Sequence, residues 1–453
     1  MIRLVASLAI ILVLMFSAAD LYAATVELWP ETYFQLQQYR DVDRLKVDKT
    51  RFTQYLTFNL FEEAEVPRHR FFASFRIDVD LGTDASPDVN PNPLAYQSMA
   101  LLYAYWEWRR IGDAVDLTVG RQIVADELGM AALDGVRVVV RRNWYVGLDL
   151  HAGLEVKGGL NLEEDGFYLP NSDTFEPDGT IGDDLTTGAF GAAAFLDGVE
   201  DTDLRVQYRH LYSGETDGQK AGVVFRQRLF DVWELYTLDD FNILMERFSQ
   251  LHFGTGLNFG WIAVNVDHWA SNPDFDGDSI FNFFPIYAEK ELALSLYFAM
   301  DDKTRFNLGY SRLHQGDTSI VFDDWGHEGN ASHMARFSAW RRLGEYTDLR
   351  LNWSMNRGWG GDTQRFLLGA GSYVWNRHIR LDAAWMGTYY SQLLYTDVLE
   401  KLANTGFSWG FYGQSEFRLH PEVSILLQGE VSSNRYIERQ FALFSVLDVH
   451  MWL

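Results

Sequence analysis

The sequence predicts an all-β fold: a transmembrane, antiparallel, up-and-down β-barrel of about 22 strands, within a range of roughly 18 to 22. Three observations predict it. Apolar and polar residues alternate along many short segments, short and long connections alternate between those segments, and aromatic residues make up 15% of the chain. Membrane barrels need such aromatic residues for the girdles at the two membrane interfaces.

The alternation is clearest in residues 71–81. One face carries Phe71, Ala73, Phe75, Ile77, Val79 and Leu81, and the other carries Phe72, Ser74, Arg76, Asp78 and Asp80. The segments 144–155, 203–209, 304–311 and 348–356 repeat this period of two, which indicates strands with one apolar face. A soluble sandwich would turn that face inward, whereas a membrane barrel turns it toward lipid.

The connections between these strands favour the membrane barrel. Short connections are expected at 109–113, 141–143, 197–202, 230–231, 259–260, 301–303, 342–347, 375–377 and 419–421, and longer ones at 82–93, 122–132, 156–187, 270–285, 315–330 and 393–404. Membrane barrels have short turns at one end and long loops at the other, which a sandwich gives no reason to expect. An even number of strands places both ends of the barrel on the short-turn, periplasmic side.

The first 23 residues have the pattern of a signal peptide. Arg3 precedes an apolar run from Leu4 to Phe16 that is too short to span a bilayer, and small residues follow it. We therefore expect residues 1–23 to be cleaved and residues 24–453 to form a single barrel in a bacterial outer membrane, with its lipid as partner. The chain contains no cysteine, so we expect neither disulfides nor Cys-ligated haem.

Charge and residue pattern argue against two functional classes. A formal charge of −25 opposes binding to nucleic acid phosphates. His151, His210, His268, His314 and His378 lie on different predicted strands, and no serine stands in a nucleophile-elbow pattern. We therefore expect no enzymatic activity and no cofactor held by this chain.

The polar faces of the strands would line the lumen and are rich in charge. The candidate lumen residues are Arg76, Asp78, Asp80, Arg137, Asp149, Arg205, Arg209, Arg305, Arg350, Arg380 and Asp382. Their charges could orient a solute or dock a protein. They could equally form a mixed-sign network that satisfies polar groups on a barrel wall, and the sequence leaves both interpretations open.

The longest loop, 156–187, is strongly acidic. Glu163, Glu164 and Asp165 are candidates for a constriction or for concentrating cations at the pore mouth, although a solvated loop is the simpler interpretation. A second acidic stretch, Asp274, Asp276 and Asp278, has the spacing of the start of a calcium loop. The twelfth position is Pro285 rather than Glu, so only a surface calcium site of another kind is possible there.

One motif carries a family resemblance. Gly120-Arg121-Gln122 ends a predicted strand, and Asp134-Gly135 opens the next. This pattern resembles that of the porin-like families that include alginate-export barrels, which implies a barrel and a channel. Arg121 and Asp134 would face each other across a hairpin, so we expect them to pair, and the glycines would permit a bulge.

Two functions remain open at this point. The first is a porin-like channel for passive passage of hydrophilic solutes through a charged lumen. The second is a sleeve: in length and strand number the chain resembles the barrels of porin–cytochrome conduits, which house a multihaem cytochrome for electron transfer across the outer membrane. The chain has no Cys-x-x-Cys-His haem motif, so any haem would belong to a lumenal or periplasmic partner.

Overall fold

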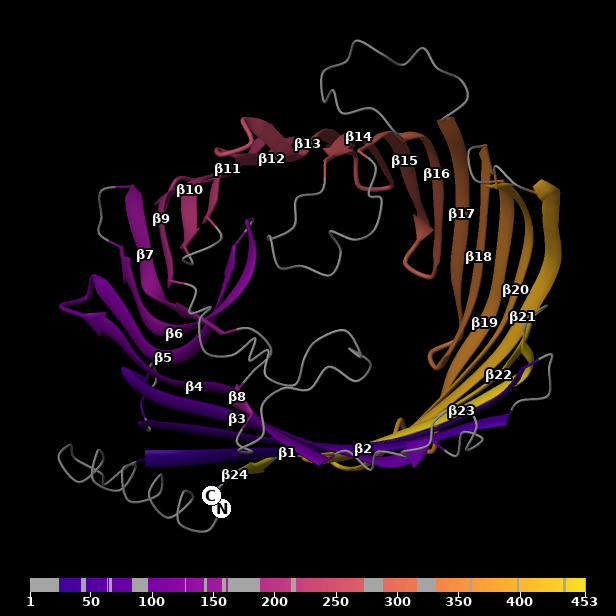
Figure 1. Cartoon of the computed structure of the whole chain (residues 1–453), viewed down its shortest axis with the longest axis horizontal. Coiled ribbons are helices and arrows are strands. Elements are labelled where there is room, and N and C mark those ends of the chain that lie inside the picture. Colours follow the sequence, from indigo (N-terminus) through magenta and orange to yellow (C-terminus); the bar gives the residue numbers. More distant parts are fainter. Residues whose placement is uncertain are drawn as a thin grey trace.

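The computed structural model describes residues 24–41, 46–62, 64, 67–83, 97–126, 128–141, 145–156, 160–161, 188–212, 217–272, 288–315, 331–358, 361–396, 399–434 and 437–452. They form one closed antiparallel β-barrel (Figure 1). The predicted fold class and the strand number of 22 are confirmed. The expected signal peptide, residues 1–23, lies outside the described residues.

The strands follow one another around the ring in chain order. They are β1 (Ala24–Asp41), β2 (Lys46–Glu62), β3 (His69–Thr83), β4 (Gln97–Ile111), β5 (Val115–Asp126), β6 (Gly129–Val140), β7 (Val146–Glu155), β9 (Gly188–Leu196), β10 (Thr202–Tyr212), β11 (Asp217–Leu229), β12 (Trp233–Asn242), β13 (Arg247–Asn258), β14 (Ile262–Ser271), β15 (Glu289–Asp301), β16 (Thr304–Gln315), β17 (Ala331–Leu343), β18 (Thr347–Gly358), β19 (Asp362–Val374), β20 (Ile379–Thr396), β21 (Leu399–His420), β22 (Val423–Ser433) and β23 (Ile437–Val449). Two short strands complete the sheet: β8 (Leu160–Asn161) pairs with β4, and β24 (Met451–Trp452) continues β23.

The barrel closes where the first and last strands pair. β1 pairs with β23 from Glu31 opposite Asp448 to Asp41 opposite Ile437. β1 starts beside the end of β2, next to the 63–68 connection, and β23 ends beside the 421–422 turn. Both barrel ends therefore lie on the side of the short connections, as the even strand number predicts.

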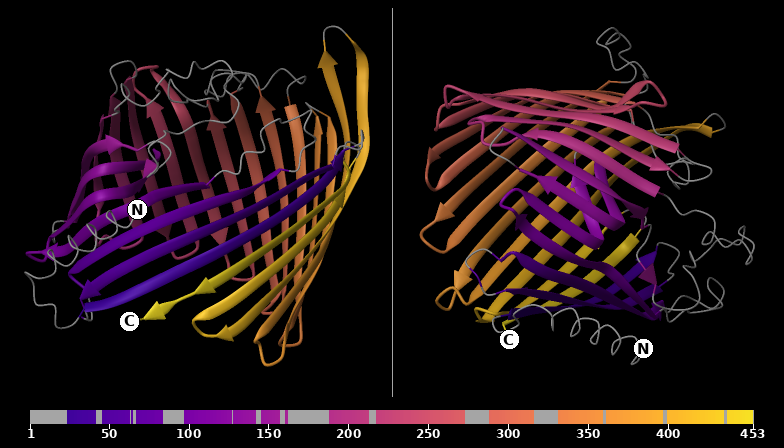
Figure 2. Two further views of the ribbon diagram at one scale, coloured as in Figure 1. Left: turned by 60° about the horizontal axis from the view of Figure 1, so that its bottom comes forward. Right: turned by 90° about the vertical axis from the view of Figure 1, so that its left-hand side faces the viewer.

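Two predicted long loops are strands instead. Residues 393–396 belong to β20 and residues 399–404 to β21, and the two strands pair in a long hairpin that projects beyond the rim (Figure 2). Residues 122–126 continue β5 and residues 129–132 belong to β6, and they form a second hairpin, paired from Gln122 opposite Leu133 to Asp126 opposite Gly129. The sequence predicted loops there because the regular alternation of apolar and polar residues ends at these points. The backbone pairing between the two strands of each hairpin nevertheless continues.

The two faces of the wall differ as expected for a barrel in lipid. On β7, Leu148 and Leu150 are each 45% exposed, whereas Asp149 between them is 2% exposed. The same inversion occurs on β10, where Val206 is exposed and Gln207 is buried. The apolar side chains therefore face outward and the polar ones face the lumen. Among the described residues, no helix is long or apolar enough to cross a membrane.

Candidate functional site

The hairpin at residues 122–132, here called the tip hairpin, leaves the barrel wall. β5 pairs with β4 only as far as Arg121 opposite Ala104, and β6 pairs with β7 only as far as Leu133 opposite Glu155. Beyond those points β5 and β6 pair with each other. In Figure 1 this purple hairpin stands inside the ring beside β10 and β11, so part of the wall has folded into the lumen.

Glycines permit the bend at the base of the tip hairpin. Gly120 has a φ of +118°, and a Cβ there would lie 2.3 Å from the carbonyl oxygen of Ala104. A Cβ on Gly135 would lie 2.2 Å from the carbonyl oxygen of Ala152 and 2.6 Å from the Cα of Gly153. The backbones of β4 and β7 thus approach β5 and β6 too closely for any side chain at either glycine.

An ion pair joins the two strands at the same level. Arg121 Nε donates to Asp134 Oδ1 at 2.8 Å, and Nη2 donates to Oδ2 at 2.6 Å. Arg121 Nη1 also donates to the carbonyl oxygen of Leu101 on β4 at 3.2 Å. The Arg121 side chain is buried, so this bidentate pair fixes the angle at which the hairpin departs.

The tip hairpin packs against small residues on the inner wall. Val124, Ala131 and Leu133 form a buried apolar cluster with Ala189 of β9, and Leu211 of β10 packs against them. Further along, a Cβ on Gly222 of β11 would lie 2.7 Å from a methyl group of Leu128 at the hairpin tip. Small residues on the inner wall, Ala189 and Gly222, therefore make space for the tip hairpin.

A polar contact, here called the latch, fixes the end of the hairpin. Arg209 of β10 donates from Nη2 to Asp126 Oδ1 at 2.5 Å and to the carbonyl oxygen of Gly129 at 2.9 Å. Its Nη1 reaches the carbonyl oxygen of Leu128 at 3.4 Å. The side chains of Arg209 and Asp126 are only 6% and 4% exposed, so water screens this ion pair little.

The neighbouring wall carries a three-residue charge cluster. Asp149 of β7 accepts two hydrogen bonds from Arg137 of β6, at 3.0 and 2.7 Å, and one from Arg205 of β10 at 2.9 Å. Arg205 also donates to Gln207 at 3.1 Å. One buried carboxylate thus organises two guanidinium groups on the inner face.

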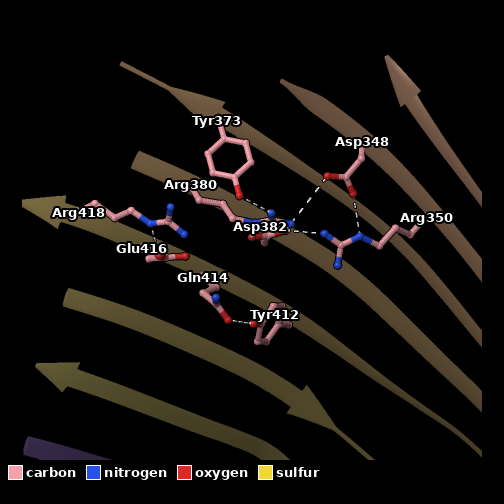
Figure 3. Close-up of polar contacts among 9 residues, drawn as sticks. All are labelled: Asp348, Arg350, Tyr373, Arg380, Asp382, Tyr412, Gln414, Glu416 and Arg418. Carbon is pink, nitrogen blue, oxygen red and sulfur yellow. Dashed lines mark hydrogen bonds and ion pairs between the residues drawn. The ribbon is translucent and has the colours of Figure 1, made fainter. Parts of the chain in front are cut away.

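A second cluster lies on β18, β19 and β20 (Figure 3). Asp382 accepts from Arg350 Nη2 at 2.9 Å and from Arg380 Nε at 2.7 Å, and Arg350 Nε donates to Asp348 at 2.8 Å. Arg380 Nη1 donates to the Tyr373 hydroxyl at 2.9 Å. Gly371 makes room, since a Cβ there would lie 2.4 Å from Asp382 Oδ1.

The remaining candidates are more dispersed. Arg76 Nε lies 2.7 Å from Asp78 Oδ2 on β3, and Arg305 stacks over the ring of Trp340 with its Cζ 5.5 Å from the centroid. Asp80 lies on β3, but its side chain is outside the description. Glu163, Glu164, Asp165, Asp274, Asp276 and Asp278 also lie outside the described residues, and no metal-ligand cluster occurs within those that are described.

The sequence interpretation missed the binding face for the tip hairpin. It singled out Arg209, but it did not pair Arg209 with Asp126, and it gave no role to Ala189 or Gly222. A signal was present: in Gly188–Leu196 the buried positions are alanines and a glycine, while a phenylalanine, Phe190, faces outward. Such small inner-face residues indicate that something packs against the wall.

An apolar exterior, a polar interior and a closed 22-strand sheet define a transmembrane β-barrel with porin-like architecture. No protein-family model and no curated protein matches the sequence. Solved structures similar to the chain include the Pseudomonas aeruginosa protein OpdK with vanillate (11% identity, 95% of this chain and 99% of that one, TM-score 0.39) and OccK2 from the same organism (10%, 95% and 98%, 0.44). The P pilus usher pore PapC is similar at 11% identity over 93% and 99%, with a TM-score of 0.49.

Proposed function

We propose that the protein is an outer-membrane channel for passive passage of hydrophilic solutes, narrowed by its own tip hairpin. The observation that carries the proposal is the latch, because a buried ion pair fixes a folded-in piece of wall inside the bore. A 22-strand barrel is otherwise wide enough to require a plug. In this chain the wall itself supplies an obstruction.

The chemistry of the wall supports hydrophilic solutes of either sign. Asp149 and Asp382 each bind two arginines, so positive and negative groups alternate at short range on the inner face. Such a surface holds water and offers donors and acceptors to a polar solute. Outward leucines such as Leu148 and Leu351 would contact the lipid partner.

The tip hairpin also bears on the sleeve alternative. A partner threaded through the barrel would meet the hairpin and its exposed face, which carries Ile123 and Ala125. A self-narrowed bore has no physical need for such a partner. The channel is therefore the function that the geometry supports best.

Single-channel recording tests the proposal. Purified protein in a planar bilayer should give a stable, water-filled conductance with discrete levels, and liposomes containing it should swell in isotonic sugar. Protein shown free of any haem partner that gives no conductance, while running as a folded barrel on unheated gels, would contradict the channel. Mass spectrometry of the protein from outer membranes should find an N-terminus near Ala24.

The acidic loop is proposed as a second element of the pore. Neutralising Glu163, Glu164 and Asp165 together should shift the reversal potential in a salt gradient away from cation selectivity. An unchanged reversal potential would show that the loop does not contribute to ion selectivity, and it would not affect the proposed role of the tip hairpin.

A further inference from the structure

A cavity of about 460 Å³ opens on the inner wall where β1, β2, β3 and β23 lie side by side. Its volume falls within the range of small-molecule sites, about 300–1,000 Å³. Its lining strands differ from β9, β10 and β11, which hold the tip hairpin. The cavity therefore needs an explanation of its own.

One side of the cavity is aromatic. The ring of Tyr33 on β1 lies 5.4 Å from that of Tyr55 on β2 and 5.8 Å from that of Phe444 on β23, measured between centroids. The interplanar angles are 79° and 39°, so the rings meet edge to face and tilted rather than fully stacked. The result is a strip of aromatic carbon across three strands of an otherwise polar wall.

The other side of the cavity is a hydrogen-bonding surface. Asp78 accepts from Arg51 at 3.0 Å and from the Thr53 hydroxyl at 2.7 Å, and Arg76 Nε lies 2.7 Å from its second oxygen. The Asp78 side chain is 5% exposed, whereas those of Arg51 and Arg76 are 44% and 34% exposed. The carboxylate is occupied by these groups, while the two guanidinium groups keep N–H donors exposed at the cavity.

Among the described residues that line the cavity, the formal charges cancel. Glu31, which accepts from the Tyr33 hydroxyl at 2.8 Å, and Asp78 balance Arg51 and Arg76. A charged solute would be attracted by one pair of these groups and repelled by the other. A neutral solute with several hydroxyl groups meets no such repulsion and can use both the donors and the acceptors.

We propose that this cavity is a binding subsite for a neutral pyranose sugar. The apolar C–H face of the ring would lie on the strip of Tyr33, Tyr55 and Phe444, and its hydroxyl groups would bond to Arg51, Arg76 and Glu31. This inference rests on the proposed channel function, and it adds a substrate class that the channel concentrates at its wall.

Current block by maltotriose in a planar bilayer tests the proposal. Wild-type channels should show concentration-dependent interruptions, and the Tyr33→Ala/Phe444→Ala variant should raise the half-blocking concentration at least about tenfold. Tyr412→Ala, which removes a tyrosine of β21 outside the cavity, is the matched control and should leave the block unchanged. If the alanine variant fails to assemble, Tyr33→Leu keeps apolar volume while removing the aromatic face.

The outcomes separate this subsite from the channel itself. Three results would overturn the subsite and leave the channel function intact. The first is conduction that maltotriose does not block, the second is a stronger block by glucuronate, and the third is a block that is the same in the Tyr33 and Phe444 variants. Isothermal titration of detergent-solubilised barrel with maltotriose covers the reverse case. Binding that is lost in the aromatic variants, in a protein that does not conduct, would support the subsite and refute the channel.

Discussion

Replacing Arg209 with methionine should weaken the docking of the tip hairpin, so that it undocks for brief periods. The substitution removes one partner of a buried ion pair and leaves Asp126 unpaired, which costs about 3–5 kcal/mol in similar pairs. The apolar cluster remains: Val124 and Leu133 are each 1% exposed, and burying each contributes about 1.5–3 kcal/mol. The docked hairpin therefore keeps about 3–6 kcal/mol of an original stabilisation of about 6–11 kcal/mol.

These magnitudes predict distinct single-channel records. At 1.4 kcal/mol per factor of ten, the undocked fraction rises from below about 10⁻⁴ to between about 10⁻⁴ and 10⁻² in Arg209→Met, which should appear as brief excursions to a larger conductance. Adding Leu133→Ala removes about 2–5 kcal/mol more, so the undocked fraction of the double variant should rise by a further factor of about thirty or more.

A compensating variant identifies the cause. Arg209→Met combined with Asp126→Leu removes both charges, and an apolar pair of similar volume often replaces a buried ion pair without loss of stability. This double variant should return to the wild-type record. Excursions that persist in it, or an Arg209→Met record identical to wild type, would refute the view that the latch holds the hairpin in the bore.

The other predictions concern the wall. Leu351→Arg, on the lipid-facing side of β18, should lower the free energy of unfolding in liposomes by about 2–4 kcal/mol, whereas Asn352→Arg on the lumen side should lower it far less. Equal losses in the two variants would contradict the assignment of the lipid and lumen faces. Gly135→Ala should impair assembly, measured as loss of the heat-modifiable band on gels, because its Cβ would collide with the backbone of β7. Gly429→Ala is the control, since a Cβ at Gly429 would have no atom within 4 Å. Equal folding of the two variants would contradict the close approach at Gly135. Arg350→Gln should move the reversal potential toward cation selectivity, and an unchanged reversal potential would exclude this arginine from the ion path.

The general fold was predictable because its signals are local. A period of two along 71–81 or 348–356 shows in a few residues, and the alternation of turn lengths shows in the spacing of those segments. The short distance along the chain between Arg121 and Asp134 likewise allowed their pairing to be inferred from one hairpin.

The tip hairpin and the cavity were not predictable for the opposite reason. Asp126 and Arg209 are 83 positions apart, and nothing local to either residue indicates the contact. The cavity combines Tyr33 with Phe444, which meet only because the barrel closes between its first and last strands. Such contacts depend on the register of the whole ring, which the period of two does not fix.

Folding part of a barrel wall inward leaves backbone groups of the adjoining strands without their usual partners, and a membrane does not tolerate this. Two features of this chain address it on β4. Arg121, the same residue that pairs with Asp134, donates to the carbonyl oxygen of Leu101 above the point where β5 departs. β8 then pairs with β4 at Ala100 and Leu101, where β5 would have continued. The Gly-Arg-Gln and Asp-Gly motif therefore has a structural role that does not depend on any solute. Its glycines allow the hairpin to turn into the lumen, and Arg121 bonds to a carbonyl oxygen of β4 that the turn leaves without its strand partner.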